Sequence, residues 1–274
     1  MGKNISNTQI IQQQYYGYCN TPNLWFDNTV FGLNQFDDPY HPDTQFTNYI
    51  ALPQRLGKRV EHFVFQDLQQ HPNIKLLATN LQIQKNKHTI GEFDALLYVF
   101  NKPIHLEIIY KFYLYDPHVG STALDYWIGP NRRDALVKKL DKLKNQQLPL
   151  LHKPETLSYL NDLSLHVQDI EQHVLFKAQL FMPFKTKVTN ITPLNQDCIQ
   201  GFYYKLDELP SLHNCKFYIP PKLDWLSQAQ YNVKWLHYKT LTKSLNAFLS
   251  NKQSPLVWIK RPDNTLERCF MVWW

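Results

Sequence analysis

The sequence predicts an α/β protein in which helices flank a mixed central β-sheet. Apolar residues recur at intervals of three and four over residues 54–70, the pattern of a helix with one buried face. Three segments rich in β-branched, aromatic and aliphatic residues follow at 74–84, 90–100 and 104–115, and each is typical of a strand. A second helical pattern at 131–147 precedes a further strand at 173–181. The order helix, three strands, helix, strand predicts an αβββαβ core.

Local signals support these elements in turn. His71-Pro72 ends the first helix, because proline cannot continue one. In the third strand the even positions from Ile104 to Leu114 are all apolar, so that one face belongs to the core. Gly129-Pro130-Asn131 is typical of a helix start, and leucines at 136, 140 and 143 form one stripe of the helix that follows.

Three regions are expected along the chain. Residues 1–52 are rich in Asn, Gln, Thr, Tyr and Pro and predict a loop-rich N-terminal extension with at most short helices. Residues 53–182 hold the αβββαβ core. A further helix is expected near 155–171, within the core region. Residues 183–274 form a C-terminal extension that packs on the core, with elements expected near 201–206 (strand), 239–249 (helix), 255–260 (strand) and 268–273 (strand).

Composition excludes several classes of protein. No CxxC pair occurs among the four cysteines, and no apolar run approaches the ~20 residues of a membrane span, so we expect a soluble cytoplasmic protein without a membrane partner. The chain has eight glycines and no GxSxG, Walker A, GxGxxG or HExxH motif, which argues against Rossmann and P-loop nucleotide binding. A net charge of +6 is compatible with a polyanionic partner.

The predicted hairpin formed by the second and third strands carries acidic residues on one face. If Asn101-Lys102 is a two-residue turn, Glu92 lies opposite Lys111, and Asp94 lies diagonally from Glu107 with Cβ atoms roughly 7–8 Å apart or less. Two carboxylates at that spacing can hold one Mg²⁺ or Mn²⁺, with Glu92 as a further candidate ligand.

A metal held in this way activates water and neutralises charge on phosphorus, while a nearby lysine, here Lys111, stabilises the same charge. These residue types predict phosphodiester hydrolysis. The alternative is a solvated polar face on which Glu92 and Lys111 form an ordinary cross-strand ion pair.

The helix expected at 131–147 has a basic flank that suits nucleic-acid phosphates. Binding through such a flank is salt-dependent and largely independent of sequence. The alternative is a solvated helix face with ordinary surface charges. The residues proposed to bind nucleic acid are Arg132, Arg133, Lys138, Lys139 and Lys142.

Four short motifs resemble the bacterial DUF1853 family of unknown function, over roughly residues 20–274. They are Gly91-Glu92-Phe93-Asp94, the stretch from His105 to Leu114, Gly129-Pro130-Asn131, and Gln147-Leu148-Pro149-Leu150. The order of elements is also similar to the core of the PD-(D/E)XK nuclease superfamily, with Glu61 in the first helix, Asp94 on the second strand and Glu107 on the third.

The resemblance to that superfamily implies a restriction-endonuclease-like core and a metal-dependent nuclease, with Asp94, Glu107, Lys111 and Glu61 as catalytic residues. The superfamily places its lysine two residues after the glutamate, where this chain has Ile109. Lys111 stands four residues on, roughly 13 Å from Glu107 along the strand instead of roughly 7 Å. That departure favours a second hypothesis, a catalytically inactive protein of the nuclease fold that binds nucleic acid or a protein partner.

Overall fold

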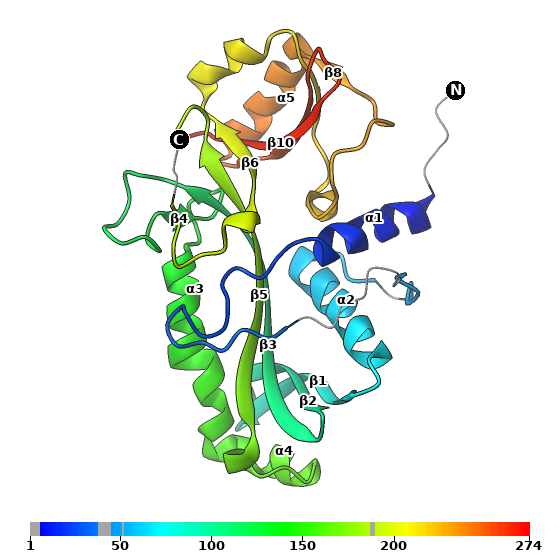
Figure 1. The fold of residues 1–274 in the computed structure, drawn as a ribbon, viewed down its shortest axis with the longest axis vertical. Helices are drawn as coiled ribbons and strands as arrows, with labels where there is room; N and C mark the ends of the chain where they lie inside the picture. Colours follow the sequence, from blue (N-terminus) through cyan, green and yellow to red (C-terminus); the bar gives the residue numbers. More distant parts are fainter. Residues whose placement is uncertain (1–5, 38–44, 51, 187–189) are drawn as a thin grey trace.

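One mixed β-sheet runs through the computed structural model, which describes residues 6–37, 45–50, 52–186 and 190–274. Within these residues the strands follow the order β1-β2-β3-β5-β6-β10-β9-β7-β8, and β4 pairs with β3 outside that path. Figure 1 shows β3 and β5 running along the long axis of the molecule. The mixed α/β class predicted from the sequence is therefore confirmed.

The elements have the following bounds. The strands are β1 (Ile74–Lys85), β2 (His88–Val99), β3 (Lys102–Tyr115), β4 (Trp127–Ile128), β5 (Glu171–Pro183), β6 (Ile199–Tyr204), β7 (Lys216–Tyr218), β8 (Leu236–His237), β9 (Leu256–Lys260) and β10 (Leu266–Met271). The α-helices are α1 (Asn7–Cys19), α2 (Leu56–Gln70), α3 (Leu136–Lys142), α4 (Leu157–Asp162) and α5 (Tyr238–Ser250). Short 3₁₀ turns fill several connections, and a π-helical turn, Leu143–Gln147, extends α3.

The predicted order of helix, three strands, helix and strand is confirmed, and β3 and β5 run parallel as a helical crossover between them requires. The start of α3 differs from the prediction. Residues 129–134 form a tight turn in which the Gly129 amide donates to the Asp134 carbonyl at 2.8 Å, so the helix begins only at Leu136. The helix expected at 155–171 is reduced to the short α4 and 3₁₀ turns.

The hairpin of β2 and β3 has a different register from the expected one. Its turn is Phe100-Asn101, both with positive φ, and it pairs Val99 with Lys102. The expected turn, Asn101-Lys102, is one position later. A positive φ is uncommon for phenylalanine, so the residue type at position 100 does not indicate the observed turn. The shift moves each pairing by two residues, so the side chains stay on the same faces while their partners change.

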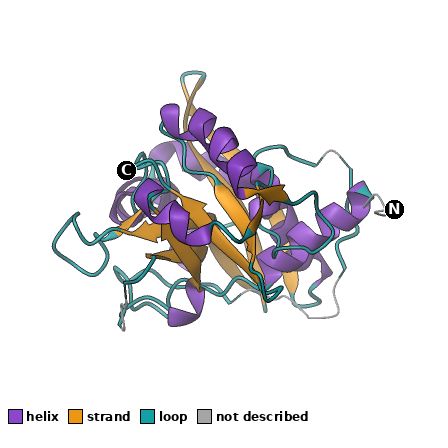
Figure 2. Cartoon of the chain, turned by 90° about the horizontal axis from the view of Figure 1, so that it is seen from above, coloured by secondary structure: helices purple, strands orange, loops and turns teal. Residues whose placement is uncertain are grey.

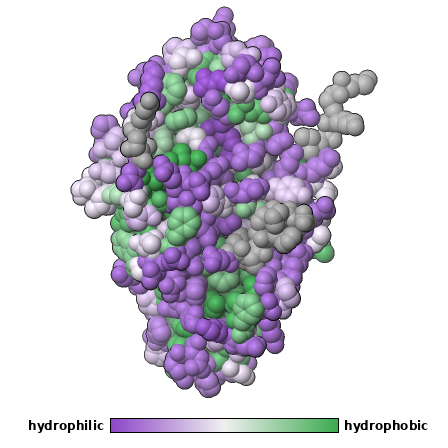
Figure 3. All heavy atoms as spheres, in the orientation of Figure 1, coloured by the Kyte–Doolittle hydropathy of each residue, from purple (hydrophilic) through white to green (hydrophobic). Residues whose placement is uncertain are grey.

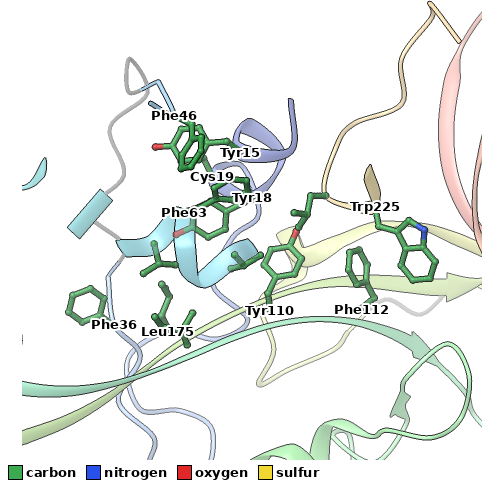
Figure 4. Packing of buried hydrophobic residues seen from close by; sticks show 14 of the residues in the cluster. Tyr15, Tyr18, Cys19, Phe36, Phe46, Phe63, Tyr110, Phe112, Leu175 and Trp225 are labelled. Atoms are coloured by element: carbon green, nitrogen blue, oxygen red, sulfur yellow. The ribbon is translucent and has the colours of Figure 1, made fainter. Parts of the chain in front are cut away.

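Helices cover both faces of the sheet (Figure 2). On one face α1 and α2 pack against the middle of β3, and Figure 4 shows Tyr15, Tyr18 and Phe63 gathered between these two helices. On the other face α3 contributes Leu136 and Leu140 to a second cluster. The segment expected to be a loop-rich extension therefore includes a thirteen-residue helix that contributes to the core.

A third apolar cluster, between α5 and the sheet's far end, joins the C-terminal strands to the rest of the sheet. On the face drawn in Figure 3, apolar atoms form scattered patches in a largely hydrophilic surface. Among the described residues, the helices are all too short or too polar to cross a bilayer.

The packing between α1 and α2 provides a test of this fold. Phe63 is fully buried and its ring lies 5.4 Å from that of Tyr15 and 4.8 Å from that of Phe46. Phe63→Ala should lower the free energy of unfolding by about 3–5 kcal/mol because it leaves a cavity in the aromatic cluster. Phe26→Ala, at a side chain that is 61% exposed, should cost less than about 0.5 kcal/mol. Urea denaturation measures both, and equal effects would contradict the packing described.

Candidate active site

Asp94 and Glu107 lie where β2 separates from β3. The last paired positions are Ala95 and Leu106, so Asp94 and Glu107 are the next residues outward on the two strands. There the Asp94 carboxylate accepts a hydrogen bond from the backbone N–H of Ile108 at 2.9 Å. The structure therefore brings together the two acids singled out in the sequence. They lie opposite each other just beyond the last paired residues of the hairpin, whereas the expected register made them diagonal neighbours.

Glu107 is fully buried and held from two sides. One carboxylate oxygen contacts His105 Nε2 at 3.1 Å, and the other accepts a hydrogen bond from the Gln147 side-chain amide. The side-chain oxygen of Gln147, Oε1, in turn accepts a hydrogen bond from Lys139 Nζ at 2.7 Å. The fixed position of Glu107 thus depends on α3 and on the π-helical turn that follows it.

His105 serves this arrangement as a neutral group. Burial lowers the pKa of His105 to about 3, and its Nδ1 lies 3.0 Å from the Gln172 side-chain nitrogen. With Gln172 donating to Nδ1, the proton of the neutral ring sits on Nε2 and points at Glu107. His105 orients Glu107 and is not placed as a metal ligand.

Glu61 and Glu92 complete an acidic cluster on the α2 side. Lys58 Nζ lies 2.8 Å from a carboxylate oxygen of each, so one lysine bridges the helix and β2. Burial raises the pKa of Glu61 to about 7, and the charges of Asp94 and Glu92 contribute in the same direction. The structure therefore brings all four predicted acids into one electrostatically coupled group.

The charges of the central pair are only partly compensated. Burial and the neighbouring Glu107 raise the pKa of Asp94 to about 6. Burial also raises the pKa of Glu107 to about 7, against the opposing effect of Lys139. Two carboxylates that resist ionisation side by side favour a cation between them or a shared proton.

The donor set suits a hard divalent cation. Among the described residues, no three His, Cys, Asp or Glu side chains stand close enough together to hold a metal. Mg²⁺, however, is usually bound through one or two carboxylates, with waters and substrate phosphate completing the shell. Asp94 and Glu107 meet that requirement, while Glu92 is engaged by Lys58.

Lys111 does not face this pair. Its Nζ lies 2.5 Å from an Asp134 carboxylate oxygen, in the turn before α3. The spacing explains the placement, because four residues of strand carry Lys111 roughly 13 Å from Glu107. Lys139 is the cation whose charge lowers the pKa of both Asp94 and Glu107. The sequence singled out Lys139 only for a basic surface, and nothing in its local pattern indicated that it turns inward.

A cleft of about 430 Å³ begins at Ile108, the residue after Glu107, and neither Asp94 nor Glu107 is part of its lining. Its floor is β3 from Ile108 to Phe112, where β2 has left the strand and β4 has not yet joined it at Leu114. The N-terminal turn of α2 forms one wall and the turn before α3 another. Among the described residues, the cleft is lined by one acidic residue, Asp134, and by four basic ones. The basic residues are Lys111, Arg133, Lys139 and Lys222.

The basic residues predicted to bind nucleic acid divide among different surroundings. Arg132 forms an ion pair with Asp116 at 2.7 Å and stacks over the Trp274 ring at 4.5 Å, so its role is structural. Lys139 faces Glu107 and Gln147, and Arg133 lines the cleft. Lys138 and Lys142 remain exposed on α3. The sequence predicted one basic flank along a helix. The structure instead has a basic cleft, with two exposed lysines on the helix next to it.

The fold and site define a class of protein, namely a mixed α/β protein in which a buried Glu107 and a half-buried Asp94 lie where two strands of the sheet separate. Residues 19–272 match a family model described as "Domain of unknown function (DUF1853)", and the chain belongs to that family. Neither the curated proteins nor the solved structures gave a match.

The raised pKa of Asp94 predicts a pH-dependent effect of its removal. An unfolded aspartate titrates near about 3.9 and Asp94 near about 6, so between these values the folded protein binds more protons than the unfolded chain. Ionisation of Asp94 therefore lowers the free energy of unfolding as the pH rises through this window. Above the window the whole of this loss is present. Asp94→Asn should gain about 2 kcal/mol relative to the parent between pH 4 and pH 7.

Urea denaturation of both proteins across this range measures the difference. His105 also titrates in this range, and its lowered pKa makes stability rise with pH between about 3 and 6.5. Burial, the main cause of that lowered pKa, is the same in both proteins, so the comparison with the parent cancels the main part of this contribution. Asp162→Asn, at an exposed position of α4, serves as the control and should show a constant difference. A constant difference for Asp94→Asn as well would contradict the electrostatics described.

Proposed function

We propose that the protein is a divalent-metal-dependent nuclease that hydrolyses phosphodiester bonds of nucleic acid. The observation that carries the proposal is the pair formed by the buried Glu107 and the half-buried Asp94, next to a cleft that begins at Ile108 and is lined by four cations. Acids that resist ionisation together are suited to hold a cation, and basic side chains next to them are suited to hold phosphate.

Asp94 and Glu107 would hold Mg²⁺ or Mn²⁺. When bound, the metal would supply a more acidic water and neutralise charge on the phosphate. The residues around it have separate tasks. His105 and Gln147 fix Glu107, and the Ile108 amide fixes Asp94, so both carboxylates are positioned before substrate arrives.

Lys139 takes the role that Lys111 was expected to have. Its side chain is held by Gln147, and burial together with the nearby Lys111 charge lowers its pKa. An ammonium fixed in this way stabilises negative charge that develops on the phosphate during hydrolysis. Lys58, which bridges Glu61 and Glu92, offsets part of the negative charge that those two acids add to the site.

A second function has one specific observation in its favour. Lys111 is engaged with Asp134, and Ile109 occupies the position where the nuclease superfamily has its lysine. A protein of this architecture that binds nucleic acid or a protein partner without cleaving it would also keep the basic cleft. Metal-dependent cleavage separates the two functions.

The nuclease proposal predicts cleavage of DNA or RNA that requires Mg²⁺ or Mn²⁺ and stops on addition of EDTA. Asp94→Asn and Glu107→Gln should each abolish it, since either change removes one of two carboxylate ligands. Lys139→Gln should lower kcat by about 10²–10³-fold, the effect of removing one fixed stabilising group. Lys111→Gln should act mainly through KM, because its ammonium lies in the cleft and away from the acid pair.

End-labelled oligonucleotides and linear plasmid provide the assay. Lys243→Gln, an exposed lysine on α5 that does not line the cleft, is the matched control and should retain parental activity. Cleavage that persists in the Asp94→Asn, Glu107→Gln double variant would rule out this site. Binding without cleavage in every metal tested would favour the second function.

A further inference from the structure

A second pocket continues the basic cleft toward the C-terminal part of the fold. It has a volume of about 440 Å³ and lies between the loop after β7, helix α5 and the start of β9. Asn131, Lys222 and Trp225 line both the pocket and the cleft, so the two form one groove. This groove leads from Ile108, the residue after Glu107, past Lys222 into the second pocket.

The second pocket is mainly apolar and includes one buried polar group without a partner. Its walls include Ile219, Pro220, Pro221, Phe248 and Pro255. Ser254, which also lines it, is 1% exposed, and its hydroxyl makes no hydrogen bond to the described residues. A buried hydroxyl without a partner is costly, and a ligand with a polar atom on a flat apolar body would satisfy it.

Positive charge is concentrated where the cleft meets this pocket. Lys222 Nζ stacks over the Trp225 ring at 4.5 Å and forms no ion pair among the described residues. Burial lowers the pKa of Lys222, and the positive charge of Lys111 acts in the same direction. An anion at the junction would relieve the repulsion between these two lysines.

We infer that this groove takes one unpaired nucleotide of a single strand, with its phosphate between Lys111 and Lys222 and its base in the Ser254 pocket. The inference rests on the proposed function and specifies the form of its substrate. Only an unstacked base can enter a side pocket, and extracting one from a duplex costs a few kcal/mol. The protein therefore prefers single strands to duplex.

Binding measured in EDTA tests the preference separately from cleavage. The probes are a fluorescent eight-nucleotide single strand, the corresponding blunt duplex, and an abasic strand with the same phosphates but no bases. By fluorescence anisotropy, the parent should bind the single strand at least about tenfold more tightly than either of the other two.

Variants at two exposed residues, Gln253 and Lys222, test the groove. Gln253→Trp places an indole at the mouth of the pocket from an exposed residue and should remove the preference for the single strand while leaving duplex binding unchanged. Lys222→Gln should weaken single-strand binding about tenfold and reduce its salt dependence by about one phosphate contact. Lys243→Gln is the control, and circular dichroism checks that each variant folds.

Equal binding of the single strand, duplex and abasic strand would overturn the inference, as would no binding to any probe or an unchanged preference in Gln253→Trp. These failures are distinguishable from failure of the proposed function. Metal-dependent cleavage without a strand preference would overturn the groove alone, and a clear preference without cleavage would overturn the nuclease alone.

Discussion

The separation of β2 from β3 is the constraint on which the site depends. Up to Ala95 and Leu106 the two strands pair as an ordinary hairpin, and beyond that point the Asp94 carboxylate takes over one backbone donor of β3. Without the Asp94 carboxylate, the backbone N–H of Ile108 would have no acceptor here. A buried donor without an acceptor lowers the stability of the fold. One hydrogen bond therefore positions a carboxylate, ends the ladder and leaves the edge of β3 open as the floor of the cleft.

The electrostatic arrangement is unfavourable for stability and suitable for binding. Buried carboxylates with raised pKa values make the folded state pay for their ionisation near neutral pH. An apolar pair at these positions would avoid that cost. Lys139 and Lys58 compensate part of the charge, from α3 on one side and α2 on the other. The remaining imbalance is what a bound divalent cation would remove, and groups with perturbed pKa values gather at functional sites for this reason.

Hydrophobic periodicity was sufficient to predict α2, the three antiparallel strands and β5, because each has a long apolar pattern. It also placed Asp94 and Glu107 on one face, since alternation along a strand survives a register shift of two residues. The register itself depends on whether Phe100 adopts a positive φ, which its residue type disfavours.

The cations were the less predictable part of the site. Lys139 is one of several lysines on a short helix, and its inward direction follows from how α3 packs and from Gln147 in the π-helical turn. Lys222 lies in a proline-rich segment more than a hundred positions from β3 and is brought to the cleft only by the arrangement of the C-terminal strands. Contacts of this kind leave no local pattern in a single sequence.

The central claim is that Asp94 and Glu107 form a cation site whose carboxylates are partly protonated until the cation binds. Isothermal titration of Mn²⁺ at pH 6.5, repeated in buffers of different ionisation enthalpy, measures the protons released on binding. The account predicts net proton release, lost together with Mn²⁺ binding in the Asp94→Asn, Glu107→Gln double variant. Mn²⁺ binding without proton release, or binding that persists in the double variant, would contradict it.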